Sequence, residues 1–113
     1  MGQPGVEQGA PAADPFQGAL FVGESNLRRG DYFHAYRAFR RAAAAAEGGD
    51  RELALGLSHL AACGYKRATG DERGAQRQLA HARRRLTPFC PEARRLDLDG
   101  LIALVGGDQA ARG

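Results

Sequence analysis

His59 and Cys63 are the two residues whose types and spacing come closest to a metal site. They stand four positions apart in a segment of helical periodicity, so their side chains lie on one face of the helix. His34 or His81 can supply a third ligand from a neighbouring helix, and zinc suits such a set. No second close pair and no Cys-x-x-Cys spacing accompanies them, and Cys63 borders an apolar stripe, which favours a small buried hydrophobe. A metal-dependent enzyme centred on His59 and Cys63 is therefore the second alternative, and we assign no metal or cofactor.

The segment from 71 to 86 carries the basic residues that could neutralise phosphates. Its arginines are Arg73, Arg77, Arg83, Arg84 and Arg85. With two acidic residues beside them, they account for the whole net charge of +3 of the chain. A basic helix can bind nucleic acid, but the aromatic partners that single strands favour are missing from this segment. A solvated helix face is the favoured interpretation, and a nucleic-acid-binding protein is the first alternative.

Acid–base or nucleophilic catalysis has no convergent set of residues in the sequence. The aspartates Asp31, Asp50 and Asp71 are assigned to helix caps, and the glutamates fall at helix surfaces or ends. No phosphate-binding glycine loop and no nucleophile elbow occurs. Cys90, before Pro91, is interpreted as an ordinary half-buried thiol rather than a reactive one. We therefore predict a protein that is not an enzyme.

Gly-Asp pairs divide the chain into the elements that would position these residues. Glycine closes a helix in the left-handed conformation, and the following aspartate caps the next helix. The pairs are Gly30-Asp31, Gly49-Asp50, Gly70-Asp71 and Gly107-Asp108. The first three predict helices over 16–29, 32–47, 51–69 and 72–86, each with an apolar stripe at helical spacing. The short connections force these helices into antiparallel hairpins.

The residues after Leu86 predict a bend and one last helix. Thr87-Pro88-Phe89-Cys90-Pro91 cannot remain helical, and Pro91 suits the start of a short turn through Arg95. Asp97 can then cap a helix over 98–105 that ends at Gly106 and covers the open end of the bundle. No segment alternates with period two, so no sheet is predicted. Residues 16–106 form the predicted domain, between a disordered arm over 1–15 and a frayed end over 107–113.

Residues 30–42 and 70–82 repeat one pattern at a shift of 40 residues. Gly30, Asp31, Ala35, Phe39 and Ala42 correspond to Gly70, Asp71, Ala75, Leu79 and Ala82. The pattern resembles the second helix of a tetratricopeptide unit, Gly-x-Tyr-x-x-Ala-x-x-x-Phe-x-x-Ala. Because true arrays repeat at about 34 residues and need about three units, a closed bundle is the better interpretation. Tyr32, Tyr36 and Phe39 are then core residues, whereas Phe33 lies off the stripe and, if exposed, can contact a partner.

Residues 21–105 resemble the family of small helical proteins called domain of unknown function 309. The match rests on the Arg-Gly-Asp-Tyr-Phe segment that ends at Phe33, on Gly56-Leu57 and on the segment from Gly70 to Leu79. The distinctive polar positions of the family are replaced, in order along this chain, by Tyr36, Arg37, Arg40, Leu55 and Tyr65. The resemblance implies a helical bundle and transfers no activity, because the activity of the family is itself uncharacterised.

Length and composition complete the expectation. The chain has 113 residues, enough for one domain, with 43% apolar and 26% charged residues. No apolar stretch approaches the roughly 20 residues of a membrane span, and no signal peptide is recognisable, so a cytoplasmic protein with two free thiols is expected. We predict an all-α fold of two helix hairpins plus a short C-terminal helix. The favoured function is a protein-interaction or scaffold module, whose partner is another protein or a second copy.

Overall fold

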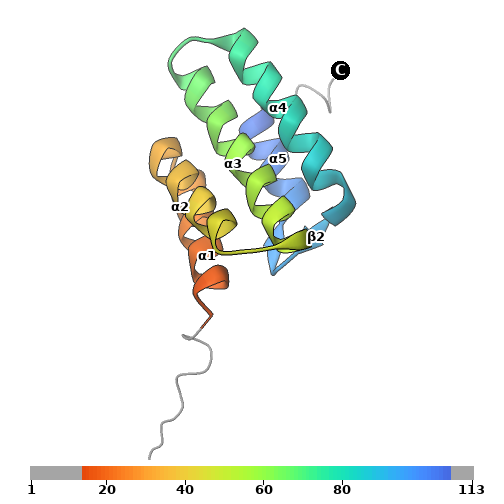
Figure 1. Ribbon diagram of the computed structural model, residues 1–113. Helices are drawn as coiled ribbons and strands as arrows, with labels where there is room; N and C mark the ends of the chain where they lie inside the picture. The colour runs from red at the N-terminus through yellow and green to blue at the C-terminus, as the bar shows by residue number, and fades with distance from the viewer. Residues whose placement is uncertain (1–13, 108–113) are drawn as a thin grey trace, which may run out of the picture.

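The computed structural model describes residues 14–107, which fold into five α-helices (Figure 1). They are α1 (Pro15–Arg28), α2 (Tyr32–Ala44), α3 (Gly48–Ala68), α4 (Glu72–Leu86) and α5 (Leu98–Gly106). The predicted small all-α bundle is confirmed. Asp14 and Pro15, which we placed in the N-terminal arm, belong to α1, where the Asp14 carboxylate caps the helix. The rest of that arm and residues 108–113 of the predicted frayed end lie outside the described residues.

Three of the four predicted aspartate caps are confirmed, and the fourth is wrong. Asp31, Asp71 and Asp97 each accept the backbone N–H three residues further on. Asp50 instead lies in the first turn of α3, which begins at Gly48 rather than at residue 51. Gly48, with φ +58°, takes the left-handed conformation that we assigned to its neighbour. Two adjacent glycines tolerate this conformation equally, so the sequence does not distinguish them.

The predicted helical turn from Pro91 to Arg95 is also wrong, as is the absence of a sheet. After a short 3-10 helix over Thr87–Phe89, the strands β2 (Glu92–Ala93) and β3 (Leu96–Asp97) pair as a small antiparallel hairpin. Arg94 and Arg95 form its turn at φ 51° and 65°, a region that non-glycine residues seldom adopt. Long-range contacts hold the turn in place: the Gln17 amide donates to the Arg94 carbonyl at 2.7 Å, and Arg94 donates to Asp50 at 2.6 Å.

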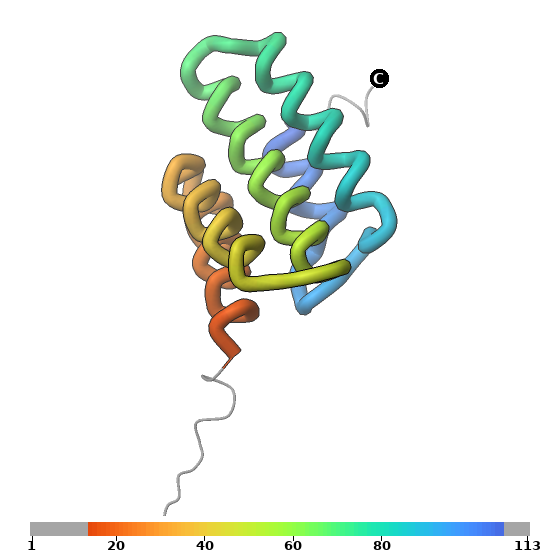
Figure 2. Tube along the Cα trace, viewed as in Figure 1, coloured from red at the N-terminus to blue at the C-terminus, as the bar shows by residue number. Residues whose placement is uncertain are grey.

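Consecutive helices pack against each other, and α3 is central (Figure 2). The helix α2 lies between α1 and α3, and α4 packs on α3 and contacts α5. Glycines allow these helices to approach closely: a side chain at Gly23 would overlap the Phe39 ring, and one at Gly56 would overlap Leu86. Phe39 is fully buried, as predicted. Tyr36 is not a core residue, because Ala35 and Ala38 occupy the buried face of α2 and leave Tyr36 38% exposed.

Candidate functional site

The structure separates His59 from Cys63. Cys63 is completely buried in the core, and this burial raises the pKa of its thiol, so it behaves as a small hydrophobe. His59 is half-buried and turns toward α4, where its ring lies 5.2 Å from that of His81, centroid to centroid. His34 is exposed at the start of α2 and contacts the capping carboxylate of Asp31 at 3.0 Å. In residues 14–107, no three His, Cys, Asp or Glu side chains are grouped to hold a metal ion.

Two separate hydrogen bonds hold the two neighbouring histidines. His59 Nδ1 donates to the Gln78 side-chain oxygen at 2.8 Å, because a carbonyl oxygen can only accept. Arg84 donates to His81 Nδ1 at 3.1 Å. Burial lowers the pKa of His59, the hydrogen bond with Gln78 raises it, and the neighbouring His81, Arg85 and Arg40 lower it again. His59 is therefore a neutral hydrogen-bonding group at pH 7.

Cys90 does not gain the activation that a reactive thiol requires. Burial raises the pKa of Cys90, and a hydrogen bond with Asp99 raises it further. Pro91 does not begin a helix next to it, so there is no helix N-terminus to stabilise a thiolate. The geometry around this residue therefore offers no support for nucleophilic chemistry.

The five arginines of α4 do not form one continuous stripe. Arg73, Arg77 and Arg84 are exposed, whereas Arg85 is half-buried and donates to Glu52 of α3 at 2.6 Å. Arg83 is exposed beside the α5 end of the fold, where its guanidinium approaches Gly106. Because α4 packs on both α3 and α5, its arginines do not share one surface: some face solvent, one contacts α3 and one lies near α5.

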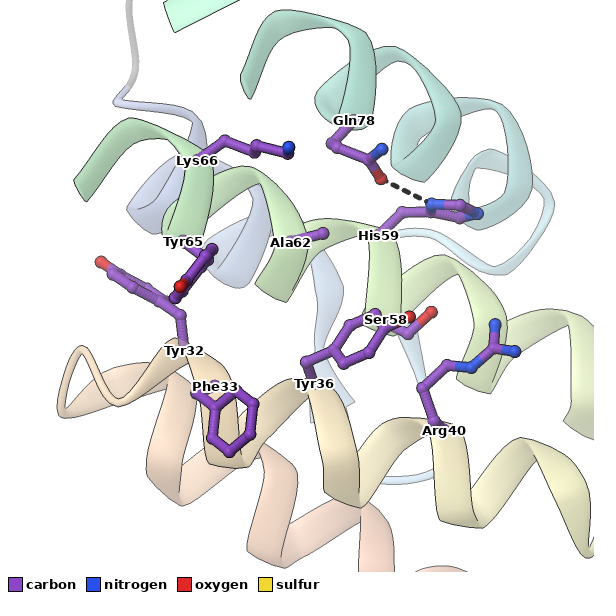
Figure 3. A pocket seen from close by; sticks show the side chains of 10 residues that line it. All are labelled: Tyr32, Phe33, Tyr36, Arg40, Ser58, His59, Ala62, Tyr65, Lys66 and Gln78. Carbon is purple, nitrogen blue, oxygen red and sulfur yellow. Dashed lines mark hydrogen bonds between the residues drawn. The ribbon is translucent and has the colours of Figure 1, made fainter. Parts of the chain in front are cut away.

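A groove lies between α2 and α4, with α3 as its floor. Its cavity volume is about 420 Å³, within the range of small-ligand and peptide pockets. Its lining residues come from three helices and are drawn in Figure 3: Tyr32, Phe33, Tyr36, Arg40, Ser58, His59, Ala62, Tyr65, Lys66 and Gln78. We call this the α2–α4 groove. Two smaller hollows, on α1 and near Phe89, have volumes of about 280 and 330 Å³.

The two sides of the α2–α4 groove differ in chemistry. On the α2 side, Phe33 and Tyr36 are 52% and 38% exposed, and Tyr65 of α3 is 49% exposed. On the opposite side, Figure 3 shows Lys66 and Gln78 close together above the α3 backbone. Ala62, a small residue, lies between the two sides and keeps the floor open.

The lining of the groove contains cationic side chains and no acidic side chain. Arg40 and Lys66 are among the lining residues, and none of the lining residues is an aspartate or a glutamate. Lys66 has a long ion pair of 3.7 Å with the capping residue Asp71. The Arg40 guanidinium lies 6.0 Å from the centroid of the Tyr36 ring and forms no ion pair with any carboxylate in the described part of the chain. The groove is therefore aromatic, donor-rich and electropositive.

The groove could not be predicted from the sequence, because its residues belong to separate helices. The aromatic partners absent from the α4 sequence are supplied by α2 and α3. One signal was present: Phe33 lies off the apolar stripe of its helix, which predicts a partner contact if it is exposed, and it lines the groove and is 52% exposed.

Comparison with known proteins gives no relative from which a function could be transferred. No protein-family model matches the chain, and no significant match is found among curated proteins or solved structures. The resemblance of residues 21–105 to domain of unknown function 309 stays a sequence-based prediction. Within the described residues, none of the helices combines the length and apolarity that a bilayer crossing requires.

Proposed function

We propose that the chain is a protein-interaction module that binds a segment of a partner protein in the α2–α4 groove. The observation that carries this proposal is the exposure of Phe33, Tyr36 and Tyr65 around one concavity. Aromatic side chains dominate binding energy when a partner desolvates them, and they are enriched in protein interfaces. The same fold buries Phe39 completely, so the exposed rings are not a consequence of an incomplete core.

A random peptide library displayed on phage tests this function directly. We expect selection on the wild-type protein to enrich peptides whose affinity falls at least about tenfold for a Tyr36→Ala/Tyr65→Ala double variant. Leu104→Ala is the matched control, because Leu104 is 52% exposed on α5 and does not line the groove. The control should bind like the wild type, and circular dichroism should show that all variants retain their helices.

Three outcomes would contradict this function. Failure to enrich any peptide would do so, and so would equal binding to the double variant. Light scattering that shows a dimer dissociated by Tyr36→Ala/Tyr65→Ala would identify a second copy as the occupant instead.

Nucleic-acid binding is the second candidate, and one observation favours it. The groove combines aromatic rings with cations, which is the combination that single-stranded nucleic acids use. This candidate predicts gel-shift binding of DNA or RNA at low salt that weakens steeply as salt rises. The double change Arg40→Glu/Lys66→Glu should also weaken it, because these two cations line the groove. Unchanged mobility of both nucleic acids at low salt excludes this candidate.

A further inference from the structure

We infer that the α2–α4 groove selects an acidic segment, one in which an apolar or aromatic side chain is flanked by carboxylates. This inference rests on the proposed function, because it specifies the partner of the same groove. Three features of the groove support it: its two cations with no carboxylate in the lining, its excess of hydrogen-bond donors, and the separation of its aromatic side from its polar side.

Charge complementarity is the first argument. A segment that enters the groove meets Arg40 and Lys66 and no lining carboxylate. Beyond the lining, Arg85 of α4 adds a further cation on the His59 side. Of the nearby carboxylates, Glu52 accepts from Arg85 at 2.6 Å and Asp71 lies 3.7 Å from Lys66, and neither lines the groove. A basic segment would be repelled here, whereas an acidic one would be attracted.

The hydrogen-bonding capacity of the groove points to the same ligand. The Gln78 side-chain oxygen already accepts from His59, so its amide N–H groups remain as donors. The Ser58 hydroxyl donates to the Leu55 carbonyl and is buried. Arg40 and Lys66 can only donate. Carboxylates, which only accept when ionised, satisfy this set better than amides or hydroxyls do.

The arrangement of the side chains predicts an order within the segment. Figure 3 shows Arg40 and Lys66 at different ends of the groove, with Tyr36 and Ala62 between them. An apolar side chain placed over Ala62 would contact the aromatic side of the groove. Carboxylates on either side of it would then reach Lys66 with Gln78 at one end and Arg40 at the other. The expected motif is acidic, apolar, acidic within a short extended or helical segment.

Three fluorescent peptides of about 12 residues test this inference by polarisation. The acidic probe alternates Glu with Phe and Leu, the neutral probe has Gln for every Glu, and the basic probe has Lys. We expect the acidic probe to bind at least about tenfold more tightly than the neutral one and to weaken as salt rises from about 50 to about 300 mM. The basic probe should bind least.

Matched variants assign the preference to the two cations of the groove. Arg40→Gln/Lys66→Gln should reduce the affinity for the acidic probe to that for the neutral probe. Arg41→Gln is the control, because Arg41 is exposed on α2 beside Arg40 and does not line the groove. The reversal Arg40→Glu/Lys66→Glu should shift the preference toward the basic probe.

Each remaining outcome counts against the inference. Equal affinity for the acidic and neutral probes would overturn it and leave the proposed function intact, provided that the phage library still yields groove-dependent peptides. An acidic preference that survives Arg40→Gln/Lys66→Gln would place the binding elsewhere. An oligonucleotide of thymidines that binds the groove more tightly than the acidic probe would favour the nucleic-acid candidate instead.

Discussion

The helices α2 and α4 have the same framework and different exposed faces. Each follows a left-handed glycine, at φ 81° and 89°, and each is capped by the next aspartate. Their corresponding apolar residues are all buried: Ala35, Phe39 and Ala42 in α2, and Ala75, Leu79 and Ala82 in α4. Both helices pack on α3, one on each side of the groove floor.

The positions outside this shared pattern carry the difference. The exposed face of α2 pairs aromatics with arginines, with the Arg37 guanidinium 5.7 Å from the centroid of the Phe33 ring. The exposed face of α4 is polar instead: Gln78 accepts from His59, and Arg84 donates to His81. The shared residues specify how the helices dock, and the residues that differ specify what the groove can bind. Substitutions at the buried docking residues should therefore change stability, and substitutions at the exposed residues should change binding.

The largest effect is expected from emptying the two equivalent docking positions. Phe39→Ala should lower the free energy of unfolding by about 3–5 kcal/mol, and Leu79→Ala by about 2–4 kcal/mol, because each leaves a cavity in the core. Urea denaturation measures both. Tyr36→Ala, on the exposed face of α2, should change stability by less than about 0.5 kcal/mol. If Leu79→Ala were as mild as Tyr36→Ala, α4 would not dock as α2 does.

The next largest effect on stability is expected at two glycines of α3, Gly56 against α4 and Gly64 against α2. Gly56→Ala forces its new methyl group into Leu86 of α4, which is fully buried and cannot move aside. Overpacking of this kind costs about 1–3 kcal/mol, against about 1 kcal/mol gained from the helix propensity of alanine. Gly64→Ala meets the ring of Tyr32 instead, which is only half-buried and can turn toward the groove.

We therefore expect Gly56→Ala to destabilise the protein by up to about 2 kcal/mol and Gly64→Ala to be nearly neutral. Thermal unfolding of the two variants measures the difference. An equal loss of stability would show that the Tyr32 ring is held as firmly as Leu86. Gly64→Ala should also change the affinity of groove-binding peptides, because Tyr32 lines the groove.

Removal of the aspartate caps should lower the stability by a smaller amount. Asp71→Ala removes the acceptor for the Gly74 N–H, which is bonded at 2.8 Å, and should cost about 1 kcal/mol. Asp71→Asn keeps an acceptor and should recover most of this loss in urea denaturation. Asp31→Ala in α2 should act in the same direction, because its carboxylate accepts from the backbone of His34. If Asp71→Ala left the stability unchanged while Asp31→Ala lowered it, the two caps would not be equivalent.

Most of the framework could be predicted from the sequence because it depends on local chemistry. Glycine followed by aspartate marks a helix end and a helix start through backbone conformation and one hydrogen bond, so Gly30-Asp31 and Gly70-Asp71 were assigned correctly. The apolar spacing identified Phe39 and Leu79 and the two helices, α2 and α4, that contain them. Asp97 was identified as the cap of α5 by the same reasoning.

The remainder depends on contacts between distant residues, which local patterns do not reveal. The turn at Arg94 is held by Asp50, 44 residues away, which also explains why Asp50 is not a cap. Tyr36 satisfies the apolar spacing, yet the neighbouring alanines permit a closer approach to α3 than a tyrosine could. The groove combines α2, α3 and α4, so none of its three segments shows a binding pattern when taken alone.

The smallest effect concerns the pH dependence of His59, on the α4 side of α3. Its pKa is lowered in the folded protein, mainly by burial, so near pH 6.5 the unfolded chain binds more protons than the folded one. Stability should therefore fall as the pH decreases through 6.5, the ordinary pKa value of histidine. His59→Gln should reduce this fall when urea denaturation is compared at about pH 7.5 and about pH 5.5.

Gln78→Ala should change the pH dependence of stability in the direction opposite to His59→Gln. The hydrogen bond from His59 to Gln78 is the interaction that raises the pKa of His59 against burial and the neighbouring cations. Without it, the pKa should fall further and the loss of stability on acidification should become steeper. The neighbouring groups that lower the pKa of His59 are His81, Arg85 and Arg40, and all three are retained in both variants. If His59→Gln and Gln78→Ala shifted the pH dependence of stability in the same direction, Gln78 of α4 would not set the pKa of His59. The polar side of the groove would then be less ordered than the aromatic side.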